Sequence, residues 1–330
     1  MDYKKHITKF DYVDARDSRI VKFKYNMGDE TRSLNSSWFR GDGANFLPVK
    51  EDLYSNVDEY IFKGLVPDDP IITKDSNVVT FGSCFAKEFN IGLAKRGLTS
   101  IQTPGTAHCV PINKKQILKV PEAIIGGVNS TYTVRQLLEW TWLNAEPVDE
   151  TWHGHDKAVI ERNEQYRQET ADRFSNADLF VIVLGLSEVW CNKETGDVFW
   201  KAIPYTQYDE TKHEFRSTTV TENKENIETI AKLIYENAPQ ASIVFILDPV
   251  PLEATFRPMN CIAADMVSKS VLRVAIDEVI RECDDSMYYF PIYEMAKSYS
   301  TDPYQTDNRH PTLELIDEMM NYFCKFYVEE

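Results

Sequence analysis

A serine in the first third of the chain and an Asp-x-x-His motif near its end have the residue types needed for nucleophilic catalysis. Ser83 follows the apolar run 78–81 and Gly82, and Asp307 and His310 stand just before the last amphipathic segment. A serine hydroxyl is a weak nucleophile until an imidazole takes its proton, and that imidazole needs a carboxylate to fix its tautomer. We therefore predict that Ser83, His310 and Asp307 form a catalytic triad.

Structural roles are the alternative for each of these residues. Ser83 can cap a helix that begins near Cys84, a role compatible with catalysis. Asp307 can be a turn residue and His310 a neutral residue before a helix. Cys84 is a rival nucleophile, because a thiol at a helix N-terminus has a lowered pKa, although its neighbours Phe81 and Phe85 predict an apolar pocket. The joint placement of the serine, histidine and aspartate favours the triad.

The elements that must position these residues follow from the hydrophobic pattern. Apolar runs predict strands at 78–81, 98–102, 178–184, 241–247 and 287–290, and fourfold apolar spacing predicts helices at 85–96, 132–144, 221–237, 262–283 and from Pro311 onward. Strands that alternate with helices predict an α/β fold with a doubly wound parallel sheet, in which ligands bind beyond the carboxyl ends of the strands. Residues 1–75 lack periodicity, so we predict an irregular N-terminal extension packed on a main domain at 76–330.

Composition and charge exclude several classes of function. The 330 residues are 43% hydrophobic, as in globular proteins, and a net charge of −16 disfavours nucleic acid or an anionic membrane as a partner. Residues 1–10 hold no apolar leader and no run approaches the roughly 18 apolar residues of a membrane span, so we expect a cytoplasmic protein. Six scattered cysteines predict neither a zinc site nor a disulfide framework, and the absence of nucleotide-binding glycine motifs predicts no such cofactor.

The segment Gly82-Ser83-Cys84-Phe85-Ala86 resembles the signature of the GSCFA family, a group related to the SGNH (GDSL-like) hydrolases. The resemblance extends from about residue 30 to the C-terminus through further motifs in the expected order, at 132–137, 185–190, 249–251, 268–269, 289–294 and 307–311. It implies a flavodoxin-like α/β/α sandwich with a parallel sheet. It also implies that Ser83 is the nucleophile, His310 the base and Asp307 the carboxylate that orients it.

The resemblance further implies an oxyanion hole built from the backbone N–H of the serine, a glycine after the second strand and an asparagine after the third. Gly105 looks like that glycine, but Ser187 stands where the asparagine is expected. A missing side-chain donor typically costs about 10²- to 10³-fold in turnover, or about 3 to 4 kcal/mol. Ser187 itself or Asn129 would have to replace it.

Several other residues are candidates for the cleft. The segment His153-Gly154-His155-Asp156 resembles a compact metal site, but a lone His-x-His is a weak signal and an exposed loop is the alternative. The family resemblance, which includes a Trp-His segment near this point, implies instead that one of these imidazoles, His153 in our assignment, lines the cleft. Glu188, Trp190 and Arg135 are further cleft candidates. Lys269 is either a solvated helix residue or a partner for an anionic substrate group.

Taken together, these features predict a serine-dependent hydrolase or esterase that acts on acyl esters, in the first instance acetyl esters, of a carbohydrate or related small molecule, without metal or cofactor. Two alternatives stay open. The same site could serve an O-acyltransferase in glycan biosynthesis, because both reactions share the first half-reaction. A non-catalytic glycan- or cofactor-binding module could also keep the scaffold after the loss of the oxyanion donor.

Overall fold

The computed structural model describes residues 9–13, 22–27, 30–35, 45, 47–102, 117–119, 128–146, 164–200, 202–203, 205–283 and 286–329. The chain forms two compact units, Met1–Ser55 and Asn56–Glu330. The boundary lies at residue 55 rather than at residue 75, where the sequence pattern had changed.

The first unit contains a small antiparallel sheet. Strands β1 (Lys9–Val13), β2 (Lys22–Met27) and β3 (Glu30–Asn35) pair in chain order, and helix α1 (Lys50–Ser55) follows. The register aligns Phe10 with Tyr25 and Phe23 with Leu34. The unit is therefore less irregular than predicted, because the apolar residues of its strands are too few to stand out as a period: β2 has three (Phe23, Tyr25 and Met27) and β3 has one, Leu34.

A six-stranded parallel sheet forms the centre of the second unit, in the order β11-β10-β7-β4-β5-β6. The strands are β4 (Asn77–Phe81), β5 (Thr99–Gln102), β6 (Ile117–Lys119), β7 (Leu179–Leu184), β10 (Ser242–Leu247) and β11 (Met287–Tyr289). Without the edge strand β6, the order is that of flavodoxin-like sheets, and it reverses direction between β4 and β7. The predicted flavodoxin-like parallel sheet is confirmed.

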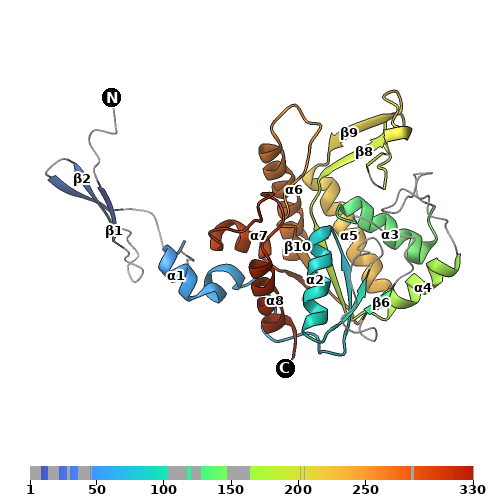
Figure 1. The fold of residues 1–330 in the computed structure, drawn as a ribbon, viewed down its shortest axis with the longest axis horizontal. Coiled ribbons are helices and arrows are strands. Elements are labelled where there is room, and N and C mark those ends of the chain that lie inside the picture. The colour runs from blue at the N-terminus through green and yellow to red at the C-terminus, as the bar shows by residue number, and fades with distance from the viewer. Residues whose placement is uncertain are drawn as a thin grey trace. The chain divides into compact units, whose positions relative to one another are not determined.

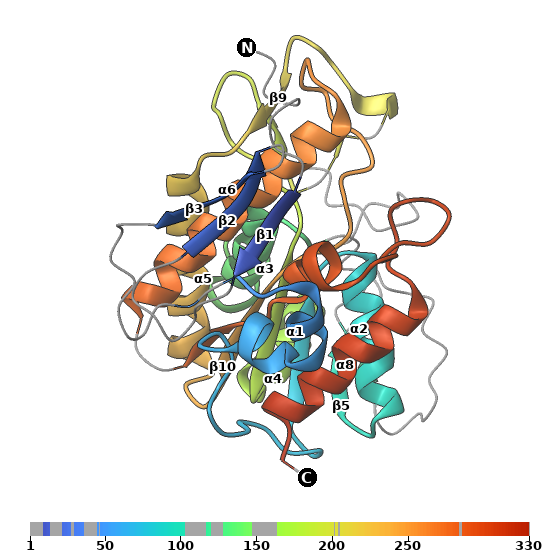
Figure 2. The same cartoon turned by 90° about the vertical axis from the view of Figure 1, so that its left-hand side faces the viewer.

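Helices cover both faces of this sheet (Figure 1). Helix α2 (Cys84–Lys95) packs beside α8 (Leu313–Tyr327), as Figure 2 also shows. Helices α3 (Thr131–Leu143), α4 (Glu164–Ser175), α5 (Val220–Asn237) and α6 (Cys261–Glu282) contact one another in a second layer. Right-handed crossovers that run in opposite directions from the centre of a sheet place their helices on opposite faces, which accounts for the two layers.

Smaller elements complete the second unit. Strands β8 (Glu188–Asn192) and β9 (His213–Ser217) form an antiparallel hairpin between β7 and α5, and a 3₁₀ turn, η3 (Tyr205–Gln207), lies between them in the chain. Near the C-terminus lie the short helix α7 (Ile292–Glu294) and the π-helical turn η4 (Met295–Tyr299). Helix α8 begins at Leu313 rather than at Pro311, because the Thr312 hydroxyl caps it by accepting from the Leu315 N–H.

Residues 56–75 belong with this second unit. The π-helical turn η2 (Asp58–Phe62) places the Phe62 ring against Phe290, Tyr322 and Phe326. The N–H groups of Ile71 and Ile72 donate to the Tyr327 carbonyl. This segment therefore packs on α8, and its aromatic contacts account for its place with the main body.

Candidate active site

The turn between β4 and α2 presents Ser83 at the carboxyl edge of the sheet. Gly82 has φ +154°, and a Cβ atom there would lie 2.7 Å from Val183 Cβ and 2.9 Å from Ala86 Cβ. Only glycine fits so closely between β7 and α2. Ser83 then caps α2, with its Oγ accepting from the Phe85 N–H at 3.2 Å. The capping role is thus present, and it fixes the serine beside β7, where the strand order reverses.

The Ser83 hydroxyl donates its proton to Asp248, which directly follows β10. Asp248 is 2% exposed, and its Oδ1 accepts from the Val250 N–H at 2.9 Å. A hydroxyl has one proton to give, so in this structure Ser83 donates to a buried carboxylate rather than to an imidazole. Sequence reasoning assigned Asp248 no role, although an aspartate directly after a buried parallel strand was the available signal.

Lys269 on α6 lies beneath this edge of the sheet. Its Nζ donates to the carbonyls of Gly185 at 3.1 Å and Val250 at 2.9 Å, and the residue is 2% exposed. Burial lowers the pKa of Lys269, while the carboxylates of Asp248 and Asp265 oppose that shift. Lys269 is therefore neither a solvated residue nor a free partner for an anionic substrate: it joins the loops that follow β7 and β10.

Asp307 and His310 form a hydrogen-bonded pair before α8. His310 Nδ1 lies 2.5 Å from Asp307 Oδ2, and Asp307 Oδ1 accepts the backbone N–H groups of Arg309 and His310, each at 3.0 Å. The hydrogen bond from His310, followed by those two backbone bonds, lowers the pKa of Asp307 to about 2. A carboxylate on Nδ1 favours the tautomer whose Nε2 can accept a proton.

A cavity of about 220 Å³ brings His310 and the residue next to Ser83 together. Cys84, Phe85, Val250 and His310 are among the residues that line it. Burial raises the pKa of the Cys84 thiol, and nearby Asp248 adds to that effect. A thiol with a raised pKa stays protonated and unreactive, which disfavours Cys84 as the nucleophile and leaves Ser83 as the hydroxyl at this edge.

The backbone after β7 is already committed to bonds within the protein. The N–H groups of Gly185 and Leu186 donate to the Asn129 carbonyl at 2.8 and 3.1 Å. The Ser187 N–H donates to Ser268 Oγ at 2.8 Å, and Ser187 is 1% exposed. These three amides are therefore not free to bind an oxyanion. Two other predicted site residues, Gly105 and His153, lie outside the described residues.

A second cavity, of about 400 Å³, brings together three residues that the sequence predicted for the site. Asn129, Glu188 and Trp190 all line it. Burial raises the pKa of Glu188, against the opposing effects of the Thr255 hydroxyl and of Arg257. The cavity contains both apolar rings and a carboxyl group, which is typical of sites for small organic ligands.

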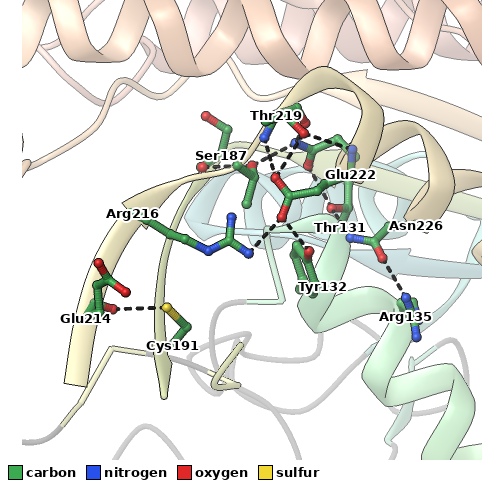
Figure 3. A network of polar contacts seen from close by, with 12 residues as sticks. Thr131, Tyr132, Arg135, Ser187, Cys191, Glu214, Arg216, Thr219, Glu222 and Asn226 are labelled. Atoms are coloured by element: carbon green, nitrogen blue, oxygen red, sulfur yellow. Dashed lines mark hydrogen bonds and ion pairs between the residues drawn. The ribbon is translucent and has the colours of Figure 1, made fainter. Parts of the chain in front are cut away.

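A polar network holds the β8–β9 hairpin on the helices below (Figure 3). Arg216 on β9 pairs with Glu222 at 2.7 Å, and Glu222 also accepts from the Tyr132 hydroxyl at 2.9 Å and closes a capping box with Thr219. Burial alone would raise the pKa of Glu222, but the hydrogen bonds, led by the one from Arg216, lower it to about 2. The network thus orients the hairpin that carries Glu188 and Trp190.

Arg135, predicted to lie in the cleft, lines neither of these two cavities. It connects two helices instead. Its guanidinium donates to Glu139 at 2.7 Å and to Asn226 at 3.0 Å, which ties α3 to α5.

The described part of the chain offers neither a metal-binding cluster nor a membrane-spanning helix. Among these residues, no cluster of three or more His, Cys, Asp or Glu side chains could hold a metal ion. None of their helices is both long and apolar enough to cross a membrane. The segment 153–156 lies outside the described residues, so its metal-site pattern stays a sequence observation.

Residues 77–323 match the model of the GSCFA family, from the first residue of β4 into α8. The chain belongs to the GSCFA family. The match covers both the Ser83 turn and the Asp307–His310 pair. A search of curated proteins found no match.

Solved structures of similar fold include three esterase or lipase chains. A candidate GDSL-like lipase from Parabacteroides merdae is 14% identical with a TM-score of 0.39, covering 78% of this chain and 97% of its own. A carbohydrate esterase of family 3 from Talaromyces cellulolyticus is 9% identical, with a TM-score of 0.36 and coverages of 75% and 94%. A family 2 carbohydrate esterase with a carbohydrate-binding domain from Corynascus thermopiles is 14% identical, with a TM-score of 0.37 and coverages of 79% and 67%. The fold assignment itself rests on the strand order.

Proposed function

We propose that this protein is a serine-dependent ester hydrolase that acts on acyl esters of a carbohydrate or related small molecule. One observation carries the proposal. The β4–α2 turn holds the Ser83 hydroxyl against buried Asp248 at the reversal point of the sheet, and the Asp307–His310 pair borders the adjoining cavity. These groups supply a nucleophile, a base and the carboxylate that orients the base.

The reaction proceeds in two steps. The Ser83 hydroxyl turns its proton from Asp248 toward Nε2 of His310, and Ser83 Oγ attacks the acyl carbon. The protonated imidazole then gives the proton to the departing alcohol oxygen, which leaves an acyl-enzyme on Ser83. In the second step His310 takes a proton from water, the resulting hydroxide attacks the acyl carbon, and the proton returns to Ser83 as the carboxylic acid departs.

Asp248 is a positioning residue in this scheme. Its bond to Ser83 selects one side-chain rotamer of the nucleophile, and its own orientation is set by the Val250 N–H. Orientation of a nucleophile before attack lowers the entropic part of the barrier. In this scheme Asp248 keeps the Ser83 side chain in one orientation at the carboxyl edge of the sheet between turnovers.

The oxyanion contacts come from groups other than Ser187 in this proposal. The amide of Ser83, Gly105 and the side chain of Asn129 are the proposed donors. Two observations support Asn129: its backbone carbonyl accepts from the loop after β7, and the residue is among those that line the larger cavity. A glycan hydroxyl in place of water in the second step would give the acyltransferase reaction from the same acyl-enzyme.

A non-catalytic binding module is the second proposal, and one observation favours it. The Ser83 proton is donated to Asp248, and the amides of residues 185–187 are all occupied within the protein. A site that no longer turns over could keep this arrangement for ligand binding alone.

Hydrolysis of p-nitrophenyl acetate and labelling by a fluorophosphonate probe test these proposals together. We expect the intact chain to hydrolyse the ester and to carry the probe on Ser83, and the Ser83→Ala variant to lose both. Ser270→Ala is the matched control, because Ser270 lies on the exposed side of α6 and its hydroxyl bonds only locally to the Met266 carbonyl. Equal rates in wild type and Ser83→Ala would remove the hydrolase assignment, and absence of labelling in a folded protein would support the module.

A further inference from the structure

Five of the fourteen residues that line the larger cavity are aromatic. Trp190, Phe199, Trp200, Phe215 and Phe256 all line it. The rings of Phe215 and Phe256 lie 5.3 and 5.0 Å from that of Trp190, with edge-to-face geometry. Phe256 is 69% exposed although it belongs to this cluster. We call this space the aromatic cavity.

A buried carboxyl group faces the same space. Glu188 lines the aromatic cavity with its side chain 4% exposed. Its Oε1 accepts from the Thr255 hydroxyl at 3.1 Å and lies 4.0 Å from the Arg257 guanidinium. A carboxylate can accept about four hydrogen bonds, so this group can still receive hydroxyl donors from a ligand.

We propose that the aromatic cavity binds a sugar ring, the alcohol part of the ester that Ser83 attacks. This inference rests on the proposed function and assigns the place where the sugar part of its substrate binds. A pyranose ring has apolar C–H faces that pack on aromatic rings and hydroxyl groups that donate to a carboxylate. The aromatic rings and Glu188 offer both kinds of partner within one cavity of about 400 Å³, a volume within the usual range for ligand pockets.

Other ligand classes fit the cavity less well. An alkyl chain would cover Glu188 without supplying hydrogen bonds, which is costly for a buried polar group. An anion would be repelled by the same carboxylate. A cation paired with Glu188 would be repelled by the Arg257 guanidinium, which lies 4.0 Å from Glu188 Oε1. A neutral polyol avoids all three penalties.

The aromatic cavity is built on the loops that also hold the nucleophile. Leu186 and Glu188 follow β7, and Leu252 and Phe256 lie beyond β10, so the lining residues gather at the carboxyl edge of the sheet. Lys269 joins these two loops through their backbone carbonyls. A sugar bound there therefore lies at the same edge as Ser83, as an ester substrate requires.

Binding can be measured without turnover in the full-length Ser83→Ala protein. We would titrate it with methyl β-glycosides of glucose, galactose, xylose and N-acetylglucosamine, and follow tryptophan fluorescence. Saturable binding of at least one glycoside is expected, weakened about tenfold or more by Phe256→Ala. Tyr205→Ala is the matched control, because Tyr205 is an aromatic residue that is 96% exposed and does not line the cavity; this variant should bind as the parent does.

Three results would overturn the inference. In the first, none of the four glycosides binds saturably. In the second, choline or hexanoate binds more tightly than every glycoside. In the third, Phe256→Ala binds the glycosides as tightly as the parent protein does. Glu188→Gln provides a second variant, expected to weaken binding because the amide loses one acceptor oxygen. Failure of the inference is distinct from failure of the proposed function: p-nitrophenyl acetate hydrolysis without sugar binding removes only the inference, and sugar binding without Ser83 labelling removes only the hydrolase.

Discussion

Replacement of Asp248 by Asn tests whether the buried carboxylate positions the nucleophile. The substitution keeps the shape of the side chain, and Oδ1 can still accept from the Val250 N–H. The group that faces Ser83 becomes either a donor or a neutral acceptor, so the charge-assisted bond to the Ser83 hydroxyl is lost. Asp265→Asn is the matched control: Asp265 is also buried, accepts the Leu252 N–H at 2.9 Å, and also attracts Lys269.

The magnitude follows from that one bond. A hydrogen bond to a charged group contributes about 1.5 to 3 kcal/mol. If that energy orients Ser83 for attack, its loss lowers the rate of acylation by about 10- to 10²-fold, at about 1.4 kcal/mol for each factor of ten. Both variants leave Lys269 short of one buried negative charge, so both should lower the free energy of unfolding by about 1 to 3 kcal/mol.

Fluorophosphonate labelling provides the assay, because the probe reports the reactivity of Ser83 without a bound sugar. The pseudo-first-order rate of labelling would be measured for wild type, Asp248→Asn and Asp265→Asn at a temperature at which all three are folded by circular dichroism. We expect the probe to label Asp248→Asn more slowly than wild type, and to label Asp265→Asn at a rate close to that of wild type. A labelling rate in Asp248→Asn equal to or above that of wild type would refute the positioning role, as would an equal loss in both variants.

Three further expectations concern the turn, the hairpin network and the cysteine. Gly82→Ala should lower the free energy of unfolding by about 2 to 5 kcal/mol through overpacking and backbone strain. Gly196 also has a positive φ but has open space around it, so Gly196→Ala should cost only the backbone strain of about 1 kcal/mol. Similar melting temperatures for the two variants would contradict the packing argument. The pKa of Glu222 falls from 4.5 to about 2 on folding, so its contribution to stability is complete above about pH 4.5 and is lost as the pH falls toward 2. Glu222→Gln should therefore reduce the change of melting temperature with pH over that window. The same pH dependence in the variant and wild type would argue against the network. Cys84→Ala should keep Ser83 labelling within a few fold of wild type, since the raised pKa keeps the thiol neutral; abolished labelling would return Cys84 to the mechanism.

Much of the main domain was predictable because its elements have strong local signals. The runs at 178–184 and 241–247 are almost entirely apolar, and they form β7 and β10 within one residue of the predicted ends. Helices α5 and α6 likewise begin within a residue of the predicted positions, since apolar spacing and polar caps lie in the same stretch of chain. The hairpin β8–β9 was not predicted, because each of its strands has only five residues and the sequence of β8, EVWCN, shows no alternation of apolar and polar residues.

The amino-acid sequence alone determined the kind of fold, the family signature around Ser83 and the pairing of Asp307 with His310, because each depends on residues that are close together in the chain. Tertiary structure decided which carboxylate holds the Ser83 hydroxyl, that Lys269 is buried beneath the loops, and that Asn129, Glu188 and Trp190 line one cavity. The bond between Ser83 and Asp248 joins residues 165 positions apart, and the bond from Lys269 to Gly185 joins residues 84 positions apart. Periodicity reports which face of an element is buried, but it carries no information about which polar side chains meet at the edge where separate strands end.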